Sequence, residues 1–181
     1  MKSYRKFIFI ATVLQLLFLN LYSQSNDECK YLMVLNYFHT NAEVNEKIKH
    51  FFPTLIKKKD RYIEFKVSDR IDFHSIRHFY EQLKSKNLGI SQDLLDPSYF
   101  YKRYYFTSFN SVFLKKLLIL NDSKLFLTFS KPFDKYLIVE LGNFDPMLNR
   151  RVKFGKAMQV LFKFDSVGLV EDVLYSGVAY N

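Results

Sequence analysis

The sequence lacks the short motifs that would assign a reaction to it. None of GxSxG, HExxH, GxxxxGK[ST] or GxGxxG occurs, so the acyl-transfer, zinc-hydrolysis and nucleotide-binding classes that these motifs mark have no support. The chain has one cysteine, Cys29, which excludes an internal disulfide. It also has no repeat and no low-complexity tract that would divide it. We therefore expect one domain that folds on its hydrophobic core, with no catalytic residue assigned by a motif.

The N-terminus has the parts of a secretory signal peptide. Lys2, Arg5 and Lys6 supply a basic start, and a mainly apolar run follows over residues 7–19. This run is shorter than the about 20 apolar residues that a membrane-spanning helix needs. Small and polar residues come next, so we expect residues 1–23 to be a signal peptide that is cleaved after Ser23. Residues 24–181 would then form a single extracytoplasmic domain, periplasmic or secreted.

Two other interpretations of this segment compete with cleavage. An uncleaved signal anchor would make the protein a membrane-tethered accessory subunit. Lipidation of Cys29 is rejected, because the charged and polar residues 26–28 stand where a lipoprotein motif has apolar and small ones.

The net charge of the chain limits the classes of partner that it is expected to bind. The formal charge of +9 falls to +6 when the three basic residues Lys2, Arg5 and Lys6 leave with the signal peptide. A basic balance favours anionic partners. Export makes nucleic acid unlikely, so we expect an anionic glycan, a lipid headgroup or another exported protein. No cofactor is predicted.

The first two thirds of the chain show mixed periodicity. Residues 28–39 fit either a helix, with Leu32, Leu35 and Phe38 on one face, or a buried strand. A capping box at Thr40 and Glu43 predicts a helix that ends near Pro53. The other expected elements are an alternating strand over 61–71, a helix capped by Asp72 and running to about Lys84, and a helix over 111–120.

The last third favours strands. KLFLTFS and KYLIVELG, at 124–130 and 135–142, indicate one hairpin. AMQVLFKFD and LVEDVLYSGVAYN, at 157–165 and 169–181, indicate a second, in which Gly168 supplies a positive φ to the turn. The order of elements predicts an α+β fold, in which N-terminal helices pack on a curved, mainly antiparallel sheet formed largely by the C-terminal third.

A resemblance follows from these strands. FSKPFDKYLIVEL, followed downstream by VLFKFDSVGLVEDV, resembles the C-terminal half of small exported bacterial proteins of unknown function. The element order is similar to the cone-shaped roll of the nuclear transport factor 2-like superfamily. That superfamily includes enzymes, ligand binders and interaction modules, and its enzymes use polar or charged groups inside the cone. No such motif matches this chain residue by residue, so the resemblance implies a fold and no activity.

One candidate metal site lies on the helix expected after Asp72. His74 and His78 stand four residues apart, and Glu81 follows one turn later, a spacing that lets side chains share a metal. The apolar residues of that helix fall on the opposite side. We therefore prefer to interpret His74, His78 and Glu81 as a solvated polar face.

One candidate ligand-binding segment is aromatic and basic. The chain has no tryptophan but 20 Phe and 13 Tyr, and several tyrosines gather around Lys102 and Arg103. On a strand, Tyr101, Arg103 and Tyr105 would share one face, where rings and a guanidinium suit an anionic ligand. The alternative is that most of these rings belong to the core.

The leading functional hypothesis is an exported binding or protein-interaction domain without enzymatic activity. The first alternative is a hydrolase or isomerase whose polar groups converge inside a cone-shaped sheet. A buried carboxylate or histidine with a shifted pKa, in a concave pocket, would favour this alternative. The second alternative is the membrane-tethered subunit described above.

Export can be tested directly. We expect the mature protein from its native host to begin near Gln24 or Asn26, because the segment before these residues has the form of a signal peptide. Mass spectrometry of the N-terminal peptide measures this. An intact N-terminus, together with association with membranes that resists carbonate, would instead support the tether.

Overall fold

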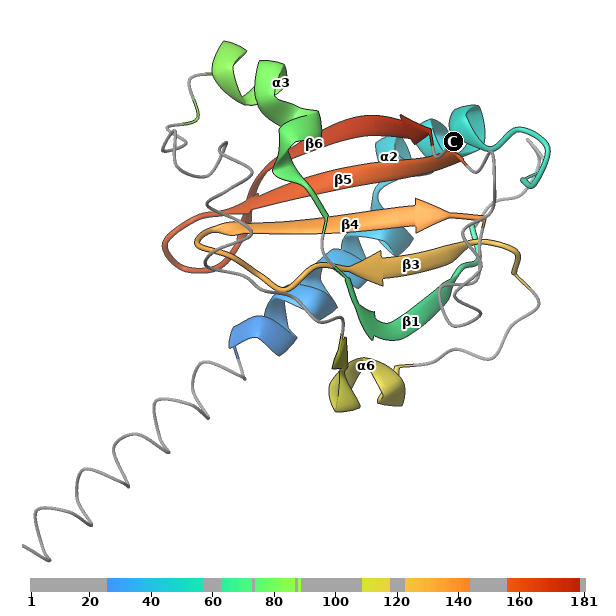
Figure 1. Ribbon diagram of the computed structural model, residues 1–181, viewed down its shortest axis with the longest axis horizontal. Coiled ribbons are helices and arrows are strands. Elements are labelled where there is room, and N and C mark those ends of the chain that lie inside the picture. The colour runs from blue at the N-terminus through green and yellow to red at the C-terminus, as the bar shows by residue number, and fades with distance from the viewer. Residues whose placement is uncertain are drawn as a thin grey trace, which may run out of the picture.

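The computed structural model describes residues 26–56, 63–72, 74–86, 88, 109–117, 123–143 and 156–179. These residues form an α+β fold with a six-stranded sheet in the order β2-β1-β3-β4-β5-β6 (Figure 1). Residues 26–40 form a helix that carries no label in the figure. The labelled elements are α2 (Ala42–Phe51), β1 (Lys66–Ile71), η1 (Ile76–Phe79), α3 (Tyr80–Ser85), β2 (Phe109–Asn110), α6 (Val112–Lys116), β3 (Phe126–Phe129), β4 (Tyr136–Gly142), β5 (Lys156–Phe164) and β6 (Val170–Ala179).

The predicted fold class is confirmed, and the sheet is mixed. Strands β3 to β6 form an antiparallel meander, which accounts for most of the sheet. Strand β1 pairs parallel to β3 and antiparallel to β2. A parallel neighbour needs a long crossover connection, and local periodicity gave no indication of this pairing.

The ambiguous residues 28–39 are helical. Tyr31, Val34 and Phe38 are buried at helical spacing, whereas Leu32 is 47% exposed. The buried face of this helix is therefore displaced by about one residue from the expected one. Of Leu32, Leu35 and Phe38, which were expected on that face, only Phe38 is buried. No helix among the described residues is long and apolar enough to cross a membrane.

The residue that caps α2 also differs from the expectation. Asn41, and not Thr40, is the N-cap, and its Oδ1 accepts from the Val44 N–H at 3.1 Å. Thr40 Oγ1 donates instead to the Asn36 carbonyl of the preceding helix, at 2.8 Å. Val44 and Ile48 of α2 are fully buried, and burial of each such side chain contributes about 1.5–3 kcal/mol.

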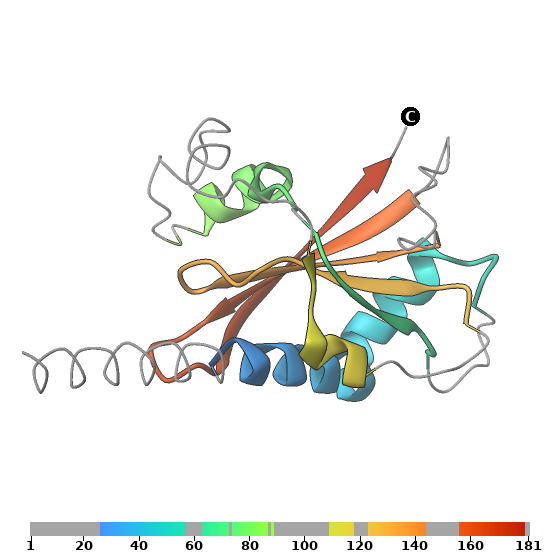
Figure 2. The ribbon, with the colours of Figure 1, turned by 60° about the horizontal axis from the view of Figure 1, so that its bottom comes forward.

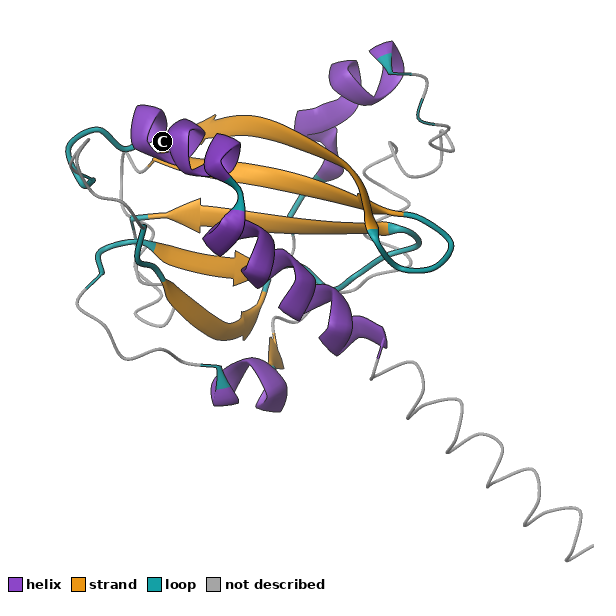
Figure 3. Ribbon diagram, turned by 180° about the vertical axis from the view of Figure 1, so that it is seen from behind, coloured by secondary structure: helices purple, strands orange, loops and turns teal. Residues whose placement is uncertain are grey.

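The sheet has a different cover on each face. One face, which we call the α2 face, carries Leu137, Val139 and Leu141 of β4 and packs against the 26–40 helix and α2. These two helices cross the strands diagonally (Figure 3). The other face, which we call the α3 face, carries Tyr136 and Ile138 and packs against η1 and α3. Figure 2 shows the sheet edge-on, with α3 on one side and the N-terminal helices with α6 on the other.

The cover of the α3 face begins later than expected. Ser75, and not Asp72, caps this segment, and its Oγ accepts from the Arg77 N–H at 3.2 Å. The segment starts as the 3-10 turn η1 before it becomes α3. Two polar contacts then fix α3 to β6: Gln82 Nε2 donates to the Tyr175 carbonyl at 2.8 Å, and Lys86 Nζ binds Asp172 at 2.8 Å.

The turn between β5 and β6 confirms the role expected for Gly168. This glycine has a φ of +87°, a conformation that glycine adopts without a steric penalty. Asp165 Oδ1 accepts from the Val167 and Leu169 N–H groups, at 3.0 and 2.8 Å. The third helix expected, over 111–120, is the shorter α6, with Ser111 as its N-cap.

Candidate functional site

A row of polar residues crosses the otherwise apolar centre of the sheet. Thr128, Glu140, Gln159 and Ser176 are directly paired from β3 to β6. Alternation of side chains places this row on the α3 face, on the same side as Tyr136 and Ile138. Glu140 is only 2% exposed and Gln159 only 3%. A carboxyl and an amide thus lie side by side in the interior of the protein.

Three of the buried polar side chains meet at one carboxylate oxygen. Gln159 Nε2 donates to Glu140 Oε2 at 2.7 Å. His74 Nδ1 lies 3.5 Å from the same oxygen, and His74 is 7% exposed. We call His74, Glu140 and Gln159 the polar cluster. It joins two central strands to the loop that follows β1.

The loop after β1 places His74 over the sheet. The Asp72 N–H donates to the Phe129 carbonyl at 2.9 Å, which extends the β1–β3 pairing past the end of β1. Arg70 Nε binds Asp72 Oδ1 at 2.7 Å. Beyond His74, the buried residues Ile76 and Phe79 of η1 pack on the α3 face. His74 is therefore held between two fixed points, one on each side in the chain.

Burial makes His74 neutral at physiological pH. Loss of solvent lowers the pKa of this imidazole below its ordinary value, and this effect outweighs Glu140, Asp72 and the Thr128 backbone, which favour the charged form. A neutral imidazole carries one proton. We assign it to Nδ1, because Nδ1 faces the Glu140 carboxylate and a bare nitrogen there would set lone pair against lone pair. Nε2 is then a hydrogen-bond acceptor.

Two atoms of the polar cluster have no partner. In the described part of the chain, the buried side-chain atoms without a hydrogen bond are His74 Nε2, Gln159 Oε1 and, away from the cluster on α2, Asn45 Oδ1. A buried polar atom left unpaired costs about 1–3 kcal/mol. One nitrogen each of Gln159 and His74 therefore faces Glu140, whereas Gln159 Oε1 and His74 Nε2 have no hydrogen bond.

The structure separates the three residues expected to share a helix face. The interpretation as a solvated face is wrong for His74, which is buried because the chain there precedes the helix and turns into the sheet. His78 and Glu81 are exposed. They line a pocket of about 440 Å³ on the outside of η1 and α3, together with Arg77, Tyr80 and Gln82.

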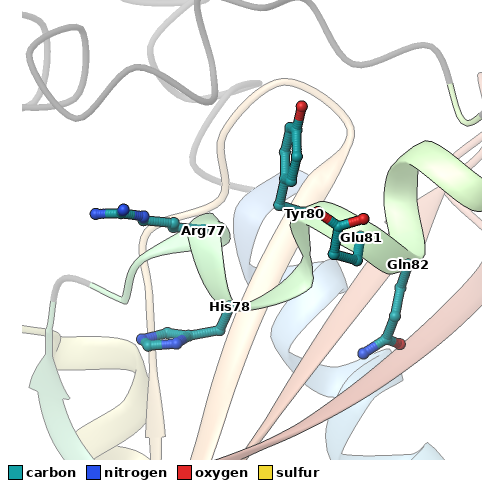
Figure 4. A pocket seen from close by; sticks show the side chains of 5 residues that line it. All are labelled: Arg77, His78, Tyr80, Glu81 and Gln82. Carbon is teal, nitrogen blue, oxygen red and sulfur yellow. The ribbon is translucent and has the colours of Figure 1, made fainter.

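The side chains around that outer pocket do not converge. Figure 4 shows Tyr80 and Gln82 pointing in opposite directions, while Arg77 and His78 both extend to a third side. Over the described ranges, no group of three or more His, Cys, Asp or Glu residues is arranged to hold a metal ion. The outer pocket therefore offers no set of groups that act on one ligand atom.

Tyr101, Arg103 and Tyr105 lie outside the described residues, so their expected common face stays a prediction. Cys29 is a free, exposed thiol in the 26–40 helix.

Sequence reasoning missed Glu140 and Gln159. Glu140 lies in the strand expected over 135–142, and its pairing with Gln159 depends on the register between β4 and β5. A signal was present in the run AMQVLFKF, where Gln159 interrupts a strand that is otherwise almost wholly apolar. A polar residue in such a run, on a strand covered on both faces, indicates a buried polar contact.

Comparisons with protein-family models, with curated proteins and with solved structures find no match for this chain. The fold and the polar cluster therefore define an α+β domain with a partly satisfied polar site in its core.

The state of His74 predicts how stability depends on pH. The folded protein holds His74 with a pKa below the ordinary value of 6.5, so the unfolded chain binds the proton more readily. The contribution of His74 to stability is complete above about pH 6.5 and is lost as the pH falls towards the folded pKa. We expect the free energy of unfolding in urea to decrease between about pH 7.5 and about pH 5.5, and His74→Gln to remove most of this decrease.

His78 provides the matched control, because it is exposed and lies four residues along the same segment. His78→Gln should keep the pH dependence of the natural protein. Equal pH dependence in the two variants would contradict the burial of a neutral His74.

Proposed function

We propose that this chain is an exported binding domain that holds a small ligand against the α3 face of its sheet. The observation that carries the proposal is the pair of unpaired acceptors, His74 Nε2 and Gln159 Oε1, in a buried polar cluster. A ligand that supplies the missing partners would complete this cluster.

The contrast between the two faces of the sheet supports the proposal. The α2 face is closed mainly by apolar side chains, which is the usual solution for a core. The α3 face has the same strands beneath it and a cover that is apolar at Ile76, Phe79 and Leu83. Burial of the polar cluster costs folding free energy that apolar residues of similar size at the same positions would not cost. Local violations of this kind are expected at functional sites.

The N-terminal sequence supports export of the protein. The basic start, the short apolar run at 7–19 and the polar residues that follow support a signal peptide. Binding in the core and export are independent parts of the proposal, so each has its own test.

A second candidate function is a hydrolase or isomerase, and the geometry around His74 favours it specifically. Glu140 lies beside Nδ1 at 3.5 Å, an arrangement in which a carboxylate orients a histidine and would stabilise its imidazolium. The bare Nε2 of a neutral histidine can accept a proton from a substrate as a general base. The outer pocket on η1 and α3 is lined by residues other than His74, and binding is therefore the first choice.

Native mass spectrometry of protein purified from its host tests the proposal. We expect a species heavier than the mature chain by one bound small molecule, and we expect His74→Phe to lose it because the variant removes an unpaired acceptor. His78→Phe is the control and should retain the bound molecule. Only the mass of the bare chain in all three proteins would contradict a binding function.

The fate of the ligand separates the two candidates. A binding domain returns the bound molecule unchanged after prolonged incubation with the protein. Conversion of that molecule by the natural protein and by His78→Phe, but not by His74→Phe, would replace binding with catalysis as the function.

A further inference from the structure

We propose that the ligand of the polar cluster presents a hydrogen-bond donor, a hydroxyl or an ammonium group, to His74 and Gln159, and brings no anionic group to that point. This inference rests on the proposed binding function and specifies the chemistry of its ligand. It differs from the anionic partner expected from the net charge, and from the anionic ligand expected at Tyr101, Arg103 and Tyr105.

An ionised Glu140 carboxylate leaves the Gln159 amide one orientation. Its Nε2 is 2.7 Å from Glu140 Oε2. A flipped amide would place its oxygen at that distance from a carboxylate oxygen, and neither atom has a proton to share. The carbonyl atom Oε1 is therefore the atom left unpaired, and it can only accept.

The unpaired atom of His74, Nε2, is also an acceptor. Its Nδ1 lies 3.5 Å from Glu140 Oε2, and Glu140 favours a proton on this ring. Burial keeps the ring neutral, so the proton at Nδ1 leaves Nε2 bare. Both unpaired atoms of the polar cluster are acceptors, and two acceptors are satisfied by donors on the ligand.

The charges around the cluster disfavour an anion. Glu140 is at its centre, and Asp72 acts on His74 with the same sign. Arg70 is already bound to Asp72. On β5, Lys163 lies on the same face as Gln159, but its Nζ donates to Glu171 Oε1 at 2.9 Å. Among the described residues, a carboxylate or phosphate would meet negative charge and two acceptors at this point.

A single buried water could also donate to both unpaired atoms. Water and a ligand differ in what they predict: a site filled by water does not respond to small organic molecules that carry the same donors. The experiment below is built on this difference.

Nitrogen-15 NMR of the mature protein first tests the assignment of the proton. We expect His74 at neutral pH to be the neutral tautomer with the proton on Nδ1 and a bare Nε2. The opposite tautomer, or an imidazolium, would overturn the proposal because Nε2 would then be a donor. This measurement uses the natural sequence and does not depend on whether any variant folds.

Three probes on one three-carbon skeleton then test the ligand chemistry. Glycerol is neutral, serinol (2-amino-1,3-propanediol) carries an ammonium group, and glycerate carries a carboxylate. We expect glycerol, serinol or both to shift the signals of His74 Nε2 and of the Gln159 side-chain amide, and glycerate to leave them in place. The stronger of the first two identifies the donor as hydroxyl or ammonium. Shifts from glycerate as large as those from the other probes would overturn the proposal.

Variants locate the effect. His74→Phe should abolish most of the probe-dependent shift at Gln159, whereas His78→Phe should leave it unchanged. No shift at the polar cluster with any probe would assign the two atoms to a buried water and overturn the proposal. If a molecule still co-purifies in that case, the binding function stands and only the inferred ligand chemistry fails; if none co-purifies, both fail.

Discussion

The structure depends on the burial of its central strands on both faces. Every residue of β4 is buried, and β5 is buried from Ala157 to Phe164. Strands in this position need a cover on each side, and the chain supplies two different ones: the 26–40 helix with α2 on one face, and η1 with α3 on the other. The α2 face is closed mainly by apolar contacts. The α3 face buries Glu140 in the same strand, so this carboxylate can be accommodated only if neighbouring side chains meet it.

The polar cluster follows from that requirement. Gln159 reaches Glu140 from the paired position on β5, and His74 reaches it from the loop that η1 holds over the sheet. Each partner uses one nitrogen towards the carboxylate and leaves its other polar atom unpaired. Since β4 and β5 are packed on both faces and η1 is packed against the sheet, the two unpaired acceptors have defined positions. A site on a rigid scaffold with groups that await a partner is what a binding function requires.

Local features of the fold could be predicted from the sequence, and long-range ones could not. The turn at Gly168, the alternation of buried residues from Ile63 to Val67 and the C-terminal strands depend on neighbours a few residues apart. The parallel pairing of β1 with β3, and the register that sets Glu140 opposite Gln159, depend on contacts between distant segments. His74 shows the consequence for the site. Helical spacing assigned it to a solvated face with His78, but the helix begins only after Ser75 and the loop before it turns inwards.

The central claim is that a small ligand completes the polar cluster. A crystal structure of the protein purified from its host, at a resolution that separates single waters, tests this claim most directly. We expect density at His74 Nε2 and Gln159 Oε1 that extends over several bonded atoms and presents a donor to each. Density for one isolated water between the two atoms, or a protein group that pairs both of them, would contradict the claim.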